Sequence, residues 1–353
     1  YNLFLTNNSH NVDFTGIELN TFFGTYGTHL DITDGARGNS AFGYHNLVDL
    51  TTGGGNTSIG LANMIFLTTG SDNVAVGSNN LRGISANTFN NCVAIGEHNF
   101  YGANGNGSDN IGIGHNNCYY VTGSDNIAIG RECLQATTSD TNVNYSVCIG
   151  YSCGRYLTSD NNTLIGRQCG EHISGTANVG MGLFALRYLQ SGSNNVAIGY
   201  NSCLSQNSGT RNFNNNIGIG YNALRGIRTG SLNTVIGYDS GKEITSSVYN
   251  VFIGSYSGRA ATTGGYNIGI GGFAGAYSTT GAYNISIGYS AGRQTTGHRN
   301  ISIGYLAGPG TGDVGISDRL YIDNSRRGTG SLIYGNMSAR SVRINGSFSV
   351  SGS

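Results

Sequence analysis

Carboxylates are the first residues in this sequence with the chemistry of a catalytic site. A typical glycoside hydrolase uses two carboxyl groups that converge on one bond. Glu97, Glu132 and Glu171 lie within a repeating pattern, so stacked repeats can bring them near one another. No nucleophile elbow, helical metal-ligand pair or phosphate-binding loop accompanies them. We therefore expect no enzymatic activity, with a glycan hydrolase as the weaker alternative.

Aspartates recur just before hydrophobic segments. Ser-Asp-Asn occupies residues 71–73, 108–110 and 124–126. Oxygen ligands of this kind suit Ca²⁺, but the Gly- and Asp-rich nonapeptide of calcium-binding β-rolls is absent. Because Asp and Asn side chains also form hydrogen bonds within turns, the pattern favours turn formation. We expect no metal ion and no cofactor.

The seven cysteines form no Cys-x-x-Cys pair. Cys133, Cys153 and Cys169 stand where other copies of the repeat have Ala291 and Ala307. A cysteine in an alanine position acts as a small buried hydrophobe, so we expect a structural role rather than metal or redox chemistry. The remaining cysteines also lie in or beside repeat positions: Cys92, Cys118, Cys148 and Cys203.

The repeat that contains these residues has the core Asn-hydrophobic-small-hydrophobic-Gly. Its closing glycines occupy positions 24, 43, 60, 77, 96, 114, 130, 150, 166, 182, 199, 220, 237, 254, 271, 288 and 304. These seventeen copies are spaced by about 17.5 residues on average. A fixed period of this length is typical of a solenoid.

Each core predicts a short strand, because alternating β-branched residues favour the extended backbone. We expect the two Val or Ile side chains to point into the coil and the glycine to turn the chain at positive φ. Stacked coils then place each Asn on the next, where side-chain amides can form a ladder. The ladder and its turns are exemplified by Asn73, Gly77, Asn126, Gly130, Asn195, Gly199, Asn284 and Gly288.

The middle residue of the core is small in most copies, as in Ala75, Gly112 and Ser286. With Val and Ile pointing inward this residue faces outward, and a column of small side chains there indicates close approach of another surface. Identical chains are the simplest partner, because closed symmetry is the default for homo-oligomers. The alternative is a monomer in which the small column packs on its own second strand.

Tyrosine takes two positions of the repeat, after the closing glycine, as in Tyr200, and before the Asn, as in Tyr266. Residues at one position stack along a solenoid, so we expect Tyr ladders with a packing role, and sugar binding as the alternative. The longest spacings between glycines leave extra residues at 131–146 and 200–216. Such loops often carry recognition in repeat proteins.

Composition excludes several classes of function. The 353 residues include 59 Gly and one Pro, and only 10% are charged. Eighteen basic and eighteen acidic residues cancel, so we expect no nucleic-acid partner. No apolar stretch reaches 18 residues, so we expect no membrane insertion.

Three regions follow from the repeat. We assign residues 1–19 to an N-terminal lead-in or cap, 20–308 to a β-solenoid shaft and 309–353 to a C-terminal β module. Alternating segments predict strands in the module at 319–324, 331–335 and 340–346. The expected fold class is therefore all-β, a β-solenoid or β-roll of about 17 coils.

The Asn-Val-Ala-Ile-Gly-Tyr repeats at 195–200 resemble the β-roll heads of trimeric autotransporter adhesins and repeats of bacteriophage tail fibres. Residues 332–346 resemble the tail-fibre segment that precedes an intramolecular chaperone. The resemblance implies a parallel homotrimer, and a mature chain that ends near residues 351–353 after the chaperone cuts itself off. The coil of about 17 residues is longer than the adhesin repeat, which favours the fibre.

These expectations together describe a structural fibre or spike protein on a virion or extracellular surface. It would present a surface for host attachment, with a host glycan or protein as receptor. A bacterial surface adhesin head is the alternative, and a tailspike-like glycan hydrolase is the less favoured one.

Overall fold

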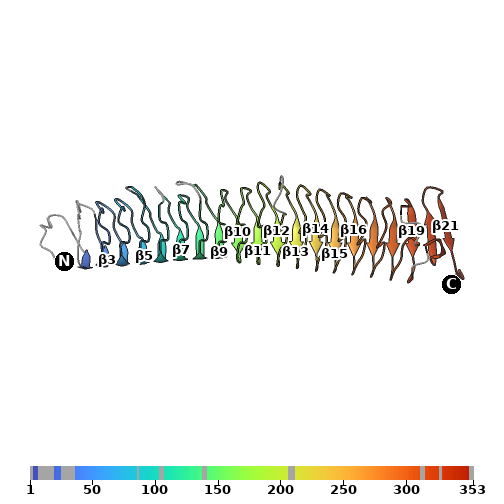
Figure 1. Ribbon diagram of the computed structural model, residues 1–353, viewed down its shortest axis with the longest axis horizontal. Coiled ribbons are helices and arrows are strands. Elements are labelled where there is room, and N and C mark those ends of the chain that lie inside the picture. Colours follow the sequence, from blue (N-terminus) through green and yellow to red (C-terminus); the bar gives the residue numbers. More distant parts are fainter. Residues whose placement is uncertain are drawn as a thin grey trace, which may run out of the picture. The chain divides into compact units, whose positions relative to one another are not determined.

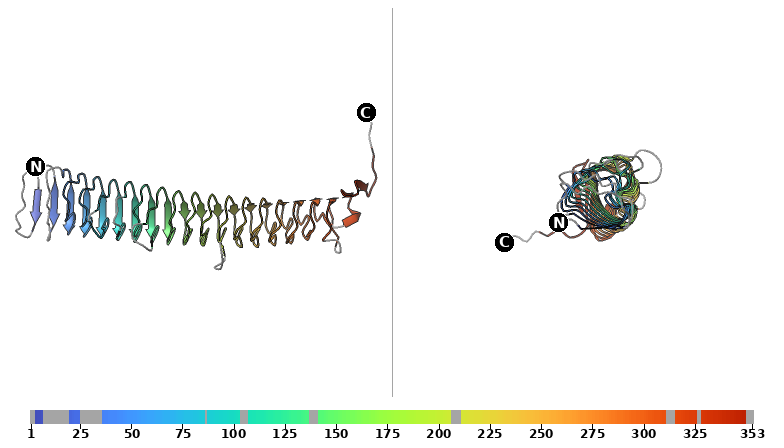
Figure 2. Two further views of the ribbon diagram at one scale, coloured as in Figure 1. Left: turned by 90° about the horizontal axis from the view of Figure 1, so that it is seen from above. Right: turned by 90° about the vertical axis from the view of Figure 1, so that its left-hand side faces the viewer.

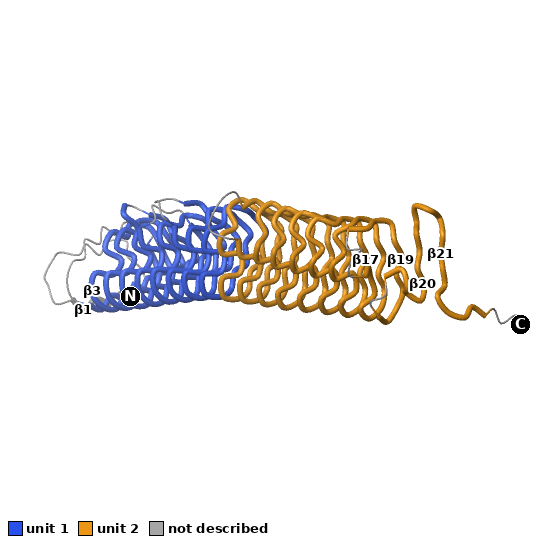
Figure 3. Tube along the Cα trace, turned by 45° about the vertical axis from the view of Figure 1, so that its right-hand side comes forward, with its two compact units in different colours: residues 1–177 blue, residues 178–353 orange. Residues whose placement is uncertain are grey.

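The chain is an all-β parallel β-solenoid of about 16 turns with a period of ~17 residues, which confirms the expected fold class. The computed structural model describes residues 3–6, 20–24, 36–85, 87–102, 107–136, 141–205, 211–310, 315–325 and 328–349. The chain consists of two compact units, residues 1–177 and residues 178–353 (Figure 3). In the described ranges, no helix has the length and apolar content needed to cross a bilayer.

The first unit is a stack of parallel strands, each one turn further along the chain (Figure 1). In this register, equivalent positions of successive repeats pair with each other, so that Ala75 pairs with Ala94 and Gly77 with Gly96. The strands are β1 (Leu3–Thr6), β2 (Thr21–Gly24), β3 (Ser40–Tyr44), β4 (Thr57–Leu61), β5 (Val74–Ser78), β6 (Val93–Glu97), β7 (Ile111–His115), β8 (Ile127–Arg131), β9 (Val147–Tyr151) and β10 (Thr163–Ile165).

The second unit continues the same pattern with shorter strands. Parallel pairs join β11 to β19 in order, and two antiparallel pairs then join β19, β20 and β21. The strands are β11 (Val179–Met181), β12 (Val196–Ile198), β13 (Ile217–Ile219), β14 (Thr234–Ile236), β15 (Val251–Ile253), β16 (Ile268–Ile270), β17 (Ile285–Ile287), β18 (Ile301–Ile303), β19 (Arg319–Ile322), β20 (Ile333–Asn336) and β21 (Ser341–Ile344), with the 3₁₀ turn η1 (Gly328–Gly330) before β20.

The last three strands lie within the segments predicted for the C-terminal module, apart from one residue at the end of β20. Parallel pairing also extends outside residues 20–308: β1 pairs with β2, and β18 pairs with β19. The turns in each unit repeat a similar outline, as the views in Figure 2 show.

The orientation predicted for the strand side chains is wrong. In β17, the middle residue Ser286 is buried, while Ile285 is half-buried and Ile287 is exposed. The same pattern recurs from β4 to β18, including Ala75, Ala128 and Ala197, which are 0% exposed. The small column therefore faces the interior of the coil, and the Val and Ile columns face outward.

Limited interior volume explains this inversion. A side chain at Gly112 would meet the ring of Phe100, because an added Cβ would lie 2.7 Å from its Cε2 atom. In many turns a large residue four positions after the closing glycine fills the core from the corner of the coil, and the strand contributes a small residue. These fully buried corner residues include Leu47, Met64, Leu81, Phe100, Leu186 and Leu224. Where that corner position is glycine, as at Gly170 and Gly258, a larger strand residue such as Leu164 or Phe252 can fill the core instead.

Candidate functional site

A ladder of buried asparagines runs along each unit, one rung per turn, with Cys92 and Ser146 in place of Asn in two turns of the first unit. In the first unit, the Nδ2 and backbone N–H of Asn73 donate to Oδ1 of Asn56 at 2.9 and 3.1 Å. Asn126 makes the same pair of hydrogen bonds to Asn110, at 3.1 and 2.9 Å. Each Nδ2 also donates to a backbone carbonyl of the next turn, at Phe89 for Asn73.

In the second unit, Asn195 donates to Oδ1 of Asn178 from both nitrogens, each at 3.0 Å. Asn284 does the same to Asn267, at 3.0 and 3.2 Å. One amide thus satisfies a backbone N–H and links three successive turns, which removes the cost of burying polar groups in a narrow core.

Loss of one asparagine from the ladder should lower the stability of the folded chain. Replacement of Asn250 by Ala removes the acceptor of the Asn267 backbone N–H, at 2.9 Å in the wild-type chain, and one of the two acceptors of Asn267 Nδ2, at 3.1 Å. Nδ2 keeps its hydrogen bond to the Gly281 carbonyl. A buried N–H left unpaired costs about 1–3 kcal/mol and each lost hydrogen bond about 0.5–1.5 kcal/mol, so we expect the free energy of unfolding to fall by roughly 2–5 kcal/mol. Urea denaturation followed by circular dichroism measures the loss. Asn324→Ala, at an exposed position of the same unit, should change it by less than about 0.5 kcal/mol; equal losses would contradict the prediction.

A second ladder, which the sequence analysis missed, occurs in the first unit. Asn99 and Asn117 are fully buried, and Asn117 donates to Oδ1 of Asn99 at 2.9 Å. Its sequence signal is an Asn three residues after the closing glycine. The members of this ladder are Asn46, Asn63, Asn80, Asn99 and Asn117, and Cys133 follows them at the same position.

All seven cysteines are buried and free of disulfides, in agreement with their expected structural role. Burial raises the pKa of the Cys92 thiol to about 11 and that of Cys203 to about 12. Thiols with raised pKa values contain very little of the reactive thiolate at neutral pH.

We therefore expect fewer than one of the seven thiols to react with Ellman's reagent in the folded protein at pH 8. All seven should react in guanidinium chloride, which serves as the positive control. Prompt reaction of two or more thiols in the folded protein would contradict the burial of these side chains.

The three glutamates considered as catalytic candidates differ in their position within the repeat and in their contacts. Glu97 follows the closing glycine directly, whereas Glu132 lies two and Glu171 five residues after it. Glu132 accepts a hydrogen bond from Ser152 Oγ at 3.1 Å and lies 3.5 Å from Arg155. Glu171 is buried beside Gln168. The three carboxylates therefore occupy different columns of the repeat.

The turn aspartates have the backbone geometry of a left-handed corner. Asp72, Asp109 and Asp125 have φ values of +58°, +58° and +60°. Asp and Asn tolerate this region better than most residues, which is a sufficient reason for their presence in these turns.

Tyrosine ladders form in the second unit. Tyr200, Tyr221 and Tyr238 stack with ring centroids 5.0 Å apart and planes within 10°. Tyr249, Tyr266 and Tyr283 form a second stack at 4.9 Å. Each ring covers the face of the next, so that the ladders present mainly ring edges and hydroxyl groups. This geometry favours the packing role over sugar stacking.

The outward strand positions of the second unit form a surface that we call the apolar stripe. It comprises both outward residues of β11 to β18, and Thr234 is its one polar member. None of these residues is charged. At least 36% of the residue surface is exposed in Val179, Met181, Ile217, Ile253, Ile268, Ile270, Ile287 and Ile303.

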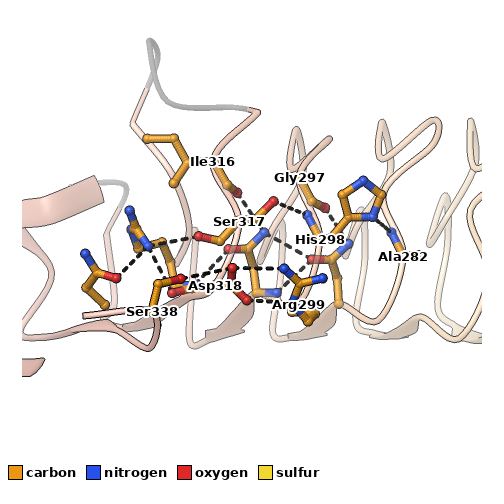
Figure 4. Close-up of polar contacts among 12 residues, drawn as sticks. Ala282, Gly297, His298, Arg299, Ile316, Ser317, Asp318 and Ser338 are labelled. Carbon is orange, nitrogen blue, oxygen red and sulfur yellow. Dashed lines mark hydrogen bonds and ion pairs between the residues drawn. The ribbon is translucent and has the colours of Figure 1, made fainter. Parts of the chain in front are cut away.

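Polar contacts join the segment just before β18 to the segments just before β19 and just after β20 (Figure 4). Arg299 donates to both carboxylate oxygens of Asp318, at 2.6 and 3.0 Å, and Ser338 donates to the same group at 3.1 Å. The hydrogen bond from Arg299 is the largest cause that holds the pKa of the Asp318 carboxyl below its ordinary value, and the hydrogen bond from Ser338 acts in the same direction. The free edge of β19, the last parallel strand, is covered by antiparallel pairing with β20.

The two predicted loops, 131–146 and 200–216, are described except at 137–140 and 206–210, and the expected end at 351–353 also lies outside the described residues. The fold and the ladders define the chain as a β-solenoid repeat protein. Comparison with protein families, curated proteins and solved structures finds no match.

Proposed function

We propose that this chain is the structural subunit of a fibre or spike on a virion or extracellular surface, and that it presents a surface for host attachment. The observation that carries the proposal is the apolar stripe. Monomeric soluble proteins rarely expose large contiguous apolar patches. Here the stripe follows eight consecutive strands without one charged residue.

The partner that suits this stripe is a second and a third copy of the chain. Cyclic symmetry about an axis parallel to the solenoid brings the same turn of each chain to the same level, so that each stripe residue meets its own copy. Burial of the Val and Ile side chains then supplies the driving force for assembly. A parallel trimer also points all chain ends in one direction, as a fibre that attaches at one end requires.

Attachment is tested with the purified chain and immobilised bacterial surface polysaccharides, with intact cells in parallel. We expect saturable binding to a subset of these surfaces, and no release of reducing ends on prolonged incubation. Release of reducing ends would replace the attachment function with that of a glycan hydrolase. Binding that is equally weak on every surface and on bare support would contradict a role in recognition.

A further inference from the structure

Glu97, His98 and His115 form a cluster in the first unit at the ends of two neighbouring strands. Glu97 is the last residue of β6, His115 is the last residue of β7, and the two are paired in register. Both side chains are accessible, with 54% of the Glu97 side chain and 38% of the His115 side chain exposed. His98 follows directly, at a φ of +55°, where the chain turns the corner.

The backbone that carries the cluster is held on both sides by hydrogen bonds between turns. The N–H of His98 donates to the carbonyl of Ser78 at 3.0 Å, and the N–H of Asn116 donates to the carbonyl of Glu97 at 3.0 Å. The position of the three side chains therefore depends on a regular part of the solenoid, as a preorganised site requires.

The side chains converge through their ligating atoms. Oε1 of Glu97 lies 3.7 Å from Nδ1 of His98, and Oε2 lies 3.7 Å from Nε2 of His115. One ligand atom from each residue can be chosen so that all three lie within 4.8 Å of one another. In a tetrahedral zinc site with bonds of about 2.0–2.1 Å, neighbouring ligand atoms are about 3.3 Å apart. Small side-chain rotations reach that spacing.

We propose that Glu97, His98 and His115 bind a divalent transition metal ion, with Zn²⁺ as the ion that fits best. Two imidazole nitrogens and one carboxylate are typical zinc ligands, whereas Ca²⁺ and Mg²⁺ prefer oxygen ligands alone. Zn²⁺ also has no geometric preference from its d electrons, which suits a site of uneven spacing. Water completes the coordination, since the three side chains are 32–54% exposed.

The surroundings permit a cation. With neutral imidazoles the cluster has a single negative charge, from Glu97. The nearest cation in the same column is Arg131, one turn further on, and its Nε lies 3.6 Å from Glu132. Nδ1 of His115 makes no hydrogen bond to a described residue, so no protein partner prevents the tautomer with a free Nε2 lone pair.

Isothermal titration calorimetry with ZnCl₂ tests the proposal on the full chain after removal of metal by a chelator. We expect one ion per chain, because all three ligands come from one chain. His98→Gln, His115→Gln and Glu97→Gln should each weaken zinc binding at least ten-fold. His172→Gln is the matched control, because His172 lies in the same unit and stacks on Tyr156 with centroids 4.6 Å apart.

Absorption of Co²⁺ in the visible range gives a second readout, because tetrahedral coordination intensifies the d–d bands, and these bands should vanish in the three variants. Circular dichroism without metal checks that each variant is folded, and Glu97→Gln at a 54% exposed side chain is the least disruptive of them. The proposal is overturned if the wild-type chain binds no zinc, or if the double variant His98→Gln/His115→Gln binds it with the wild-type affinity and stoichiometry.

Discussion

Substitution of Gly271 by Ala should destabilise the solenoid by roughly 2–6 kcal/mol. Gly271 has a φ of +123°, where an L side chain is strained, and an added Cβ would lie 2.7 Å from the carbonyl oxygen of Gly288 in the next turn. Strain at such a φ costs about 1–3 kcal/mol, and overpacking against rigid backbone adds about 1–3 kcal/mol. Urea denaturation followed by circular dichroism at fixed protein concentration measures the change.

Gly275→Ala is the matched control, four residues further along the same turn. Gly275 has a φ of +58°, and the nearest atom to an added Cβ is Oγ of Ser278 at 3.8 Å. Leu224 adopts nearly the same φ, +55°, at the same repeat position, so the backbone there accepts a side chain. We expect a loss of about 1 kcal/mol or less. If both substitutions cost the same, close stacking of the closing glycines is not what requires glycine.

The double substitution Ile253→Glu/Ile287→Glu should convert the proposed trimer to monomers. Both residues belong to the apolar stripe and are 37% and 38% exposed within one chain. In a parallel trimer each glutamate meets two copies of itself, and unpaired charges in an apolar interface are strongly unfavourable. Native mass spectrometry of the wild-type chain should give the mass of three chains, and the variant that of one.

Ile84→Glu is the control for this experiment. Ile84 is 54% exposed and lies outside the strands, so its replacement should leave the trimer intact. A monomeric wild-type chain would refute the assembly proposal, and so would a double variant that stays trimeric. Circular dichroism separates dissociation from unfolding, because the outward residues leave the asparagine ladder of each chain in place.

The repeat was predictable because it depends on local chemistry. Asn, the alternating hydrophobic residues and Gly recur at nearly constant spacing, and each type has a separate structural reason to be there. The outward and inward faces of the strand were not predictable from alternation, which is symmetric between Ile285 and Ile287 on one side and Ser286 on the other. The usual rule that larger apolar residues face inward fails in most turns, because Leu and Phe from the corner already fill the coil. It holds at Leu164 and Phe252, where the corner position is glycine.

The proposed metal site also could not be predicted from the sequence pattern. The spacing of Glu97, His98 and His115 contains no recognisable metal motif, because His115 joins the others only through the register of β6 with β7. The turn lengths between repeats determine that register, and they vary along the chain. The sequence by itself determined a β-solenoid of short strands with glycine corners, since these follow from periodicity and backbone preference. Only the tertiary structure decided which columns fill the coil and which side chains meet across turns, because both depend on the volume inside a closed turn and on the stacking of one turn on the next.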